Sequence, residues 1–149
     1  MRPCVRPPTE LRLADDSELQ ELRPETSTAH HATHLGNYAQ LLFAKSDDME
    51  AISLAEKAIT LASDDERPLL AECHFYLFAH SPKHRKDSGK ALKTLLAEGV
   101  TTGDWSFDMN LERIRREDDP RLELLEAVAR TLKDGNTSRL DAFEEWRDL

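Results

Sequence analysis

Apolar side chains recur at the spacing of an α-helix along almost the whole chain, and this periodicity constrains the fold more than any other feature of the sequence. Leu35, Ala39 and Leu42, for example, fall at positions i, i+4 and i+7 and therefore share one helical face. Alternating strand-like patterns are almost absent. The expected helices cover residues 17–23, 28–45, 49–62, 68–80, 88–99, 107–117, 120–135 and 137–149. We therefore predict an all-α fold of antiparallel helical hairpins joined by short loops.

Turn-forming residues mark the ends of these helices and the limits of the domain. Gly99 and Gly135 are expected C-terminal caps, and Pro68 suits the first turn of a helix. Residues 1–15 contain three prolines, and because proline fixes φ and removes a backbone donor, an irregular arm is expected there. Residues 16–149 are expected to form a single domain, since a chain of 149 residues can bury a sizeable core.

The chain is acidic, with 29 Asp and Glu against 20 Lys and Arg and a net charge of −9. A protein that binds duplex nucleic acid needs a basic face that displaces counterions, and an anionic membrane surface also attracts basic segments. We therefore expect neither nucleic acid nor a membrane as a partner. The excess of acid favours a basic protein partner.

Targeting signals and cysteine pairs are also missing from the sequence. No segment approaches the roughly 20 apolar residues that a membrane span needs, and no apolar run follows the N-terminus as in a signal peptide. Cys4 and Cys73 fit neither a disulfide framework nor a CxxC site. We expect a cytoplasmic protein in which Cys73 is a reduced, buried side chain with a raised pKa, and therefore not an activated thiol.

The sequence repeats itself at a spacing of 34 residues. Three positions of the first helical segment recur in a later one, as Leu35 and Leu69, Ala39 and Cys73, and Leu42 and Tyr76. The following segments correspond at a spacing of 37 residues, as Ala51 and Ser88, Ala55 and Leu92, and Ala58 and Leu95. The three extra residues fit into the basic stretch PKHRKD, residues 82–87, which we expect to be a loop. Small residues at paired positions let two helices approach closely, and larger ones a turn away fill the seam.

On these residues, the unit at 32–65 resembles a tetratricopeptide repeat, and residues 66–99 resemble a second one. The family's small-residue positions are occupied by Ala39, Ala51 and Ala58. The chain departs from the family at Ser63, where a proline usually ends the repeat, and at Ala55, which replaces an aromatic residue. The resemblance implies a short solenoid whose flanking helices, including an extension at 100–149, cap its ends. A generic helical bundle with the same spacing by chance is the alternative.

The resemblance also implies that the first helix of each unit faces a shallow groove that binds a partner protein. The residues on that face are Thr33, Asn37, Gln40 and Phe43 in the first unit and Arg67, Ala71, His74 and Phe78 in the second. Asn37 stands where relatives that hold a C-terminal carboxylate often have an asparagine. Gly36 replaces the lysine that those relatives need, and Ala71 replaces their second asparagine, so binding of such a tail is disfavoured. An ordinary exposed helix face is the alternative.

His30, His31 and His34 are the candidate metal ligands, because His30 and His34 share a helical face. Zinc needs three or four ligands, however, and no HExxH or CxxC motif completes the set. We therefore expect no metal and no cofactor.

Leu140, Phe143 and Trp146 are expected on one face of the last helix, where they would cap the end of the stack. Because aromatic residues are typical interface anchors, a secondary interface at Phe143 and Trp146 is the alternative.

No catalytic constellation or phosphate-binding loop is recognisable in the sequence, so we predict a non-enzymatic protein-interaction module. The alternative, by analogy with small acidic bacterial proteins, is an immunity protein or antitoxin that neutralises a basic toxin. A metal-dependent enzyme is the less favoured class.

Overall fold

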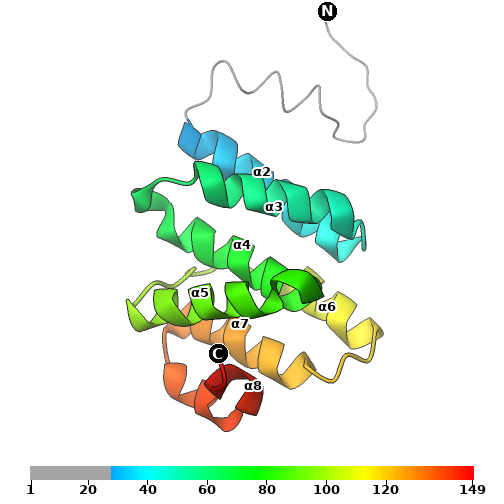
Figure 1. The fold of residues 1–149 in the computed structure, drawn as a ribbon, viewed down its shortest axis with the longest axis vertical. Helices are drawn as coiled ribbons and strands as arrows, with labels where there is room; N and C mark the ends of the chain where they lie inside the picture. Colours follow the sequence, from blue (N-terminus) through cyan, green and yellow to red (C-terminus); the bar gives the residue numbers. More distant parts are fainter. Residues whose placement is uncertain (1–27) are drawn as a thin grey trace, which may run out of the picture.

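The computed structural model describes residues 28–149, with side chains from residue 31 onwards. Figure 1 shows helices stacked one after another from the N-terminal to the C-terminal end of the molecule. They are α2 (Thr28–Ala44), α3 (Asp48–Leu61), α4 (Arg67–His80), α5 (Arg85–Ala97), α6 (Asp108–Arg116), α7 (Leu122–Asp134) and α8 (Glu144–Arg147), with short 3₁₀ helices at Asp64–Glu66, Pro82–His84 and Thr137–Ala142. This part of the chain contains no strand, which confirms the all-α prediction. The predicted arm at 1–15 and helix at 17–23 lie outside the described residues.

Two antiparallel hairpins form the N-terminal half of the stack. α2 pairs with α3 across the turn at 45–47, and α4 pairs with α5 across the 3₁₀ helix that begins at Pro82. α4 also contacts both α2 and α3, so the second hairpin stacks on the first. The C-terminal half returns to these helices, because α6 contacts α2 and α7 contacts α4.

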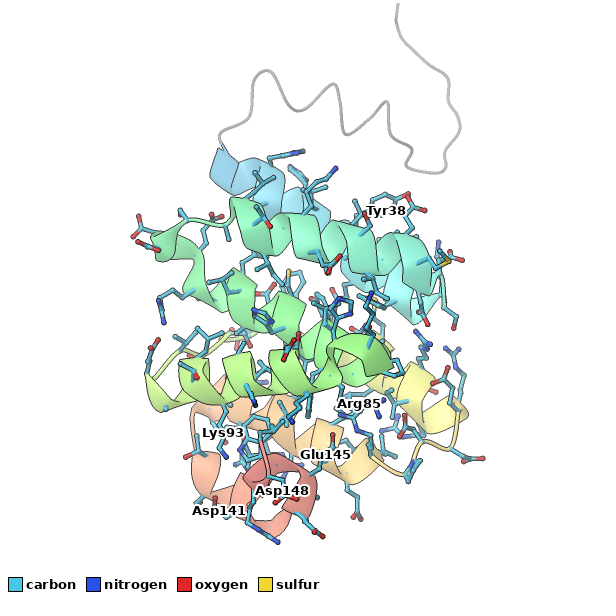
Figure 2. All side chains as sticks on the ribbon, viewed as in Figure 1. Tyr38, Arg85, Lys93, Asp141, Glu145 and Asp148 are labelled. Carbon is cyan, nitrogen blue, oxygen red and sulfur yellow. The ribbon has the colours of Figure 1, made fainter. Side chains whose placement is uncertain are left out.

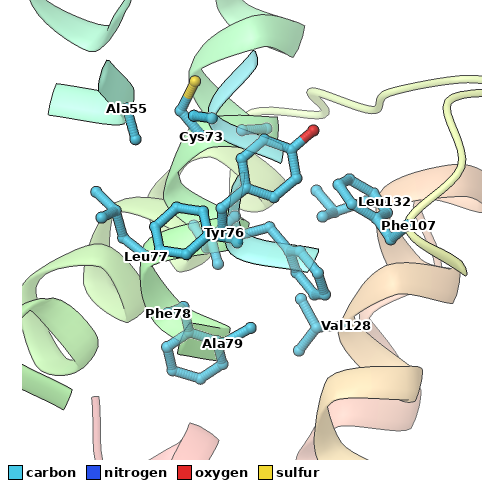
Figure 3. Close-up of a cluster of buried hydrophobic side chains, with 14 of the residues drawn as sticks. Ala55, Cys73, Tyr76, Leu77, Phe78, Ala79, Phe107, Val128 and Leu132 are labelled. Carbon is cyan, nitrogen blue, oxygen red and sulfur yellow. The ribbon is translucent and has the colours of Figure 1, made fainter. Parts of the chain in front are cut away.

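α4 is the central helix, and its second half, residues 75–80, is buried on all sides. Its buried residues are Leu69, Ala71, Cys73, Phe75, Tyr76, Leu77, Phe78, Ala79 and His80. Figure 3 shows Tyr76 and Phe78 in this core, together with Phe107 and with Val128 and Leu132 of α7. A helical segment that is buried on every face is one that other elements surround.

Different faces of α4 meet different neighbours. Leu69 and Cys73 face α2, where a Cβ atom added to Gly36 would lie 2.9 Å from Leu69 Cδ1 and 3.3 Å from Cys73 Sγ. The absence of a side chain at Gly36 therefore lets the two helices approach closely. Phe75 faces the C-terminal half of the chain, and its ring centroid lies 4.4 Å from that of Phe107.

The paired positions of the internal repeat all lie in the interior. They are Leu35, Ala39, Leu42, Ala51, Ala55 and Ala58 in the first hairpin and Leu69, Cys73, Tyr76, Ser88, Leu92 and Leu95 in the second. The spacing in the sequence therefore marks the sides on which the helices of the two hairpins pack.

The predicted helix ends at Gly99 and Gly135 are confirmed. Gly99 has a φ of +88°, and the N–H groups of Gly99 and Val100 donate to the carbonyl oxygens of Leu96 and Leu95 at 3.0 Å each, as in a Schellman motif. Gly135 ends α7 with a φ of +78°. These left-handed conformations favour glycine because it has no Cβ atom.

The basic stretch at 82–87 is not a loop, as predicted from the sequence, but is largely helical. Pro82 begins a 3₁₀ helix that runs directly into α5, so α5 begins at Arg85 rather than at Ser88. Asp87 lies in the first turn of α5, where the helix dipole favours a carboxylate.

The C-terminal segment is not the single helix that the sequence predicts. Phe143 is extended, with φ −108° and ψ 119°, between the 3₁₀ helix and α8. Along a continuous α-helix six residues rotate by about 600°, so Leu140 and Trp146 would point about 120° apart. The break at Phe143 brings both side chains into the core, where Leu140 is 0 % and Trp146 4 % exposed.

Candidate interaction surface

Four of the residues predicted to face a partner-binding groove are part of the core instead. Gln40, Phe43, Ala71 and Phe78 are 5 %, 0 %, 0 % and 0 % exposed. Gln40 is covered by the segment that leads into α6, because its Nε2 donates to the backbone oxygen of Ser106 and to Oδ1 of Asn110, both at 2.9 Å. The prediction of an open groove at these residues is therefore wrong, since the chain's own C-terminal half fills that space.

The two buried phenylalanines also face different neighbours. Phe43 stacks on His80, with ring centroids 5.1 Å apart. Phe78 lies edge-to-face with Trp146 at 6.0 Å, and the guanidinium carbon of Arg121 lies 4.7 Å from the centre of the Phe78 ring. Trp146 is therefore a buried part of the C-terminal cap and does not form the alternative interface; Phe143 beside it is half-buried.

The remaining predicted site residues do not share one surface. Thr33 is exposed and Asn37 half-buried on α2. On α4, Arg67 pairs with Glu98 at the end of α5. His74 Nδ1 lies 3.1 Å from the hydroxyl oxygen of Ser88 on α5, and burial lowers the His74 pKa to about 4. Arg67 and His74 of α4 thus contact α5, whereas Thr33 and Asn37 lie on α2.

Polar contacts that the sequence did not predict join α6 to the first hairpin. We call the four residues at their centre, Gln40, Asp48, Asn110 and Arg113, the α2–α6 junction. Arg113 is 8 % exposed, and its two terminal nitrogens donate to the carboxylate oxygens of Asp48 at 2.7 and 3.0 Å. Arg113 also donates to the backbone oxygen of Phe43 at 2.8 Å and to Glu117 at 2.9 Å. Hydrogen bonding to Asp48 raises the pKa of Arg113, so the guanidinium stays charged.

The junction reaches the end of α4 through a buried histidine. Oδ1 of Asn110 accepts from Gln40, so the Asn110 amide nitrogen donates to Nε2 of His80 at 3.1 Å. This contact places the imidazole proton on Nδ1. Burial, reinforced by the charge of Arg113, lowers the His80 pKa to about 3. His80 is therefore neutral at physiological pH and serves as a hydrogen-bonding part of the junction.

Carboxylates crowd the surface around the junction. Arg113 brings the start of α3 next to the end of α6, because it bonds both Asp48 and Glu117. The acidic residues in these two adjacent segments are Asp47, Asp48, Glu50, Glu117, Asp118 and Asp119, of which Asp48 and Asp119 are partly buried.

Exposed apolar side chains flank the junction residues in the sequence. In the part of the chain that the structure describes, the exposed large hydrophobic residues are Leu41, Met49 and Met109, at 45 %, 89 % and 43 %. Each of them is the sequence neighbour of a junction residue: Gln40, Asp48 or Asn110. We call these three residues and the six carboxylates the junction surface.

The titratable groups in the interior of α4 have strongly shifted pKa values. Burial raises the pKa of the Cys73 thiol to about 12, as predicted, so the thiolate needed for nucleophilic chemistry does not form at neutral pH. Burial also raises the pKa of Glu72 to about 7. Cys4 lies outside the described residues.

Two further expectations can be compared with the described residues. From residue 31 onwards, no three His, Cys, Asp or Glu side chains come together as a metal site; His34 is exposed and His31 half-buried, whereas the His30 side chain lies outside this range. Among the helices between residues 28 and 149, none combines the length and the apolar character that crossing a bilayer requires.

One sequence feature indicates the junction, although apolar periodicity alone does not reveal it. Phe107, Asn110 and Ile114 fall at i, i+3 and i+7, so a polar residue lies on the apolar face of α6, with Arg113 beside it. Polar groups on a buried face need partners, and this requirement points to a hydrogen-bonded contact.

Comparison with known proteins gives no match, because no family model, no curated protein and no solved structure is similar to the chain. Its functional interpretation therefore depends on the geometry of the junction surface.

Proposed function

We propose that the protein is a non-enzymatic interaction module that binds a basic partner protein through the junction surface. One observation carries this proposal: each exposed large hydrophobic side chain of residues 31–149 is the sequence neighbour of a junction residue, and Met49 stands between two of the carboxylates, Asp48 and Glu50. Isolated exposed apolar residues are ordinary, but apolar anchors surrounded by charge are typical of protein interfaces.

The two kinds of side chain have different roles in such an interface. Met49 is 89 % exposed, and burying a methionine side chain contributes about 1.5–3 kcal/mol to binding. Its flexible thioether adapts to an irregular partner surface. The carboxylates at 47–50 and 117–119 attract a basic partner and fix its orientation, which affects the association rate more than the affinity.

We further propose that α2–α5 are two tetratricopeptide-like repeats whose groove is filled by the chain itself. The buried paired positions at spacings of 34 and 37 residues support this assignment. The contact of α6 with α2 differs from the arrangement in a regular solenoid, because a stacked solenoid unit contacts only its neighbours. In this proposal the protein is cytoplasmic, where the free Cys73 stays reduced.

Neutralisation of a basic toxin is the most specific form of this proposal. An immunity protein or antitoxin of this kind would cover a basic surface of its toxin with the junction surface. The general interaction module and the toxin-neutralising protein therefore predict the same effects for mutations in the junction surface.

Affinity capture from the source cells, followed by binding measurements with the purified partner, tests the proposal. We expect one partner with a basic surface, and we expect Met49→Glu or Glu50→Lys to weaken its binding at least tenfold, or about 1.4 kcal/mol. Asp65→Lys is the matched control, because Asp65 is exposed in the 3₁₀ helix that follows α3, at the opposite end of α3 from Asp48. Equal binding by all three variants would contradict the proposal.

A further inference from the structure

The positive charge of this acidic chain is concentrated in one short segment. Residues 82–97, PKHRKDSGKALKTLLA, contain four Lys, one Arg and one Asp, a net charge of +4. Because the whole chain has a net charge of −9, the remaining residues together carry −13. Four of the chain's seven lysines lie between residues 83 and 93. The segment forms the 3₁₀ helix at Pro82–His84 and α5.

Three of these lysines line one face of α5. Lys86, Lys90 and Lys93 follow one another at i, i+4 and i+7, and Ala97 continues the same face at i+11. Lys86 and Lys90 are exposed, and within residues 31–149 neither forms an ion pair. Lys93 is half-buried, and its Nζ donates to the backbone oxygen of Trp146 at 3.2 Å. We call Lys86, Lys90 and Lys93 the lysine stripe; Figure 2 shows Lys93 on α5 above the C-terminal segment.

A hollow of about 370 Å³ adjoins the lysine stripe. Lys90, Lys93 and Thr94 line one part of it, and Ala97 and Leu149 supply an apolar part. The hollow is a shallow depression that is open to solvent. Basic side chains therefore border a place where one apolar side chain fits.

We propose that the lysine stripe and this hollow bind an acidic amphipathic helix of a partner protein. Carboxylates at i, i+4 and i+7 on such a helix match the spacing of the lysines, and an apolar residue between them enters the hollow beside Ala97 and Leu149. The site selects a partner of the opposite charge to the one that the junction surface attracts, so the proposal goes beyond the proposed function and does not depend on it.

The carboxylates around the stripe favour a narrow acidic helix over a broad polyanion. Trp146 and Leu149 of the C-terminal segment both contact α5, and the exposed acids of this segment are Asp141, Glu144 and Asp148. A helix with side chains is about 10–12 Å wide and can follow the stripe. A nucleic-acid duplex or a membrane surface extends beyond the stripe, and its phosphates would meet these carboxylates.

Fluorescence anisotropy with a synthetic peptide tests the proposal directly. The probe is a labelled amphipathic helix of about 15 residues with Glu at i, i+4 and i+7 and Leu between them, and its control has Gln in place of Glu. We expect Lys86→Glu/Lys90→Glu to weaken binding of the Glu peptide at least tenfold. Lys57→Glu is the matched control, since Lys57 is an exposed lysine on α3, and we expect it to change the dissociation constant less than twofold.

The same measurement contains the results that would overturn the proposal. These are no saturable binding of the Glu peptide, equal affinity for the Gln peptide, or equal loss in Lys57→Glu. If duplex DNA or phosphatidylserine vesicles bind more tightly than the peptide, and Lys86→Glu/Lys90→Glu abolishes that binding, the ligand of this site is a polyanion and not an acidic helix. Because both mutated lysines are exposed, circular dichroism should confirm a folded variant. The peptide should bind Met49→Glu normally, which separates this site from the junction surface.

Discussion

α6 and α7 are neighbours in the chain, but they attach to the rest of the molecule through different kinds of contact. α7 buries an apolar face against α4, with Leu124, Leu125, Val128 and Leu132 all at most 4 % exposed. α6 buries Asn110 and Arg113, which bond Gln40, His80 and Asp48. Apolar contact is non-directional and contributes in proportion to area, whereas hydrogen bonds require one relative position. We infer that α7 contributes most of the stability, whereas α6 fixes the geometry of the junction surface.

The largest expected effect is on the α7 side of this comparison. Leu132 is 0 % exposed, so Leu132→Ala leaves a cavity and should lower the free energy of unfolding by about 2–5 kcal/mol. Urea denaturation measures this loss. Leu41→Ala is the control, because Leu41 is 45 % exposed and should cost much less. Similar losses for the two variants would mean that α7 is not a core helix.

On the α6 side, the Arg113–Asp48 ion pair joins α6 to α3. Arg113→Met leaves Asp48 and the Phe43 carbonyl without their donor and should cost about 2–4 kcal/mol. Arg116→Met is the matched control, since Arg116 is exposed and should change stability by less than about 0.5 kcal/mol. Equal denaturation midpoints for the two variants would show that the ion pair does not hold α6 in place.

A smaller effect is expected from the neutral part of the junction. Asn110→Ala removes the partner of His80 Nε2 and one of the two acceptors of Gln40, and should cost about 1–3 kcal/mol. Amide hydrogen exchange should rise in α6 more than in α7 if these bonds position α6. If amide exchange in Asn110→Ala changes equally in α6 and α7, these hydrogen bonds do not position α6 in particular.

The smallest expected effect is the pH dependence of stability caused by Glu72, which lies on α4, the helix against which α7 packs. The Glu72 pKa of about 7 exceeds its usual 4.5, so the folded state binds this proton more tightly than the unfolded state. The resulting stabilisation is full below pH 4.5 and is lost as pH rises to 7. Glu72→Gln should therefore be more stable than the wild type at pH 8, by about 1–2 kcal/mol after allowing for partial exposure, and similar at pH 4. Thermal melts at the two pH values measure this difference, and an equal difference at both would contradict the assigned pKa.

The parts of the fold that depend on apolar periodicity and on caps could be predicted from the sequence. The helical segments between residues 28 and 134, the caps at Gly99 and Gly135, and the buried Cys73 follow from spacing and backbone geometry. The direction in which α4 presents His74 and Phe78 could not be predicted, because α4 has buried residues on several faces and therefore no single apolar stripe that defines its orientation.

The candidate site was harder to predict, because it depends on contacts between distant parts of the chain. Gln40 and Asn110 are 70 residues apart, and nothing in the local pattern pairs them. The break at Phe143 was missed for a similar reason, since burial of both Leu140 and Trp146 overrides the local helical pattern. Sequence periodicity therefore located the core but not the surface that α6 completes.

The central claim is that the acidic junction surface receives a basic partner, and the association rate of the captured partner tests it most directly. Stopped-flow measurements from low to physiological ionic strength should show an association rate constant that falls severalfold, with little change in dissociation. Glu50→Lys should associate more slowly and depend less on salt, because one steering carboxylate is reversed. An association rate that is independent of salt and equal in the wild type and Glu50→Lys would contradict the claim.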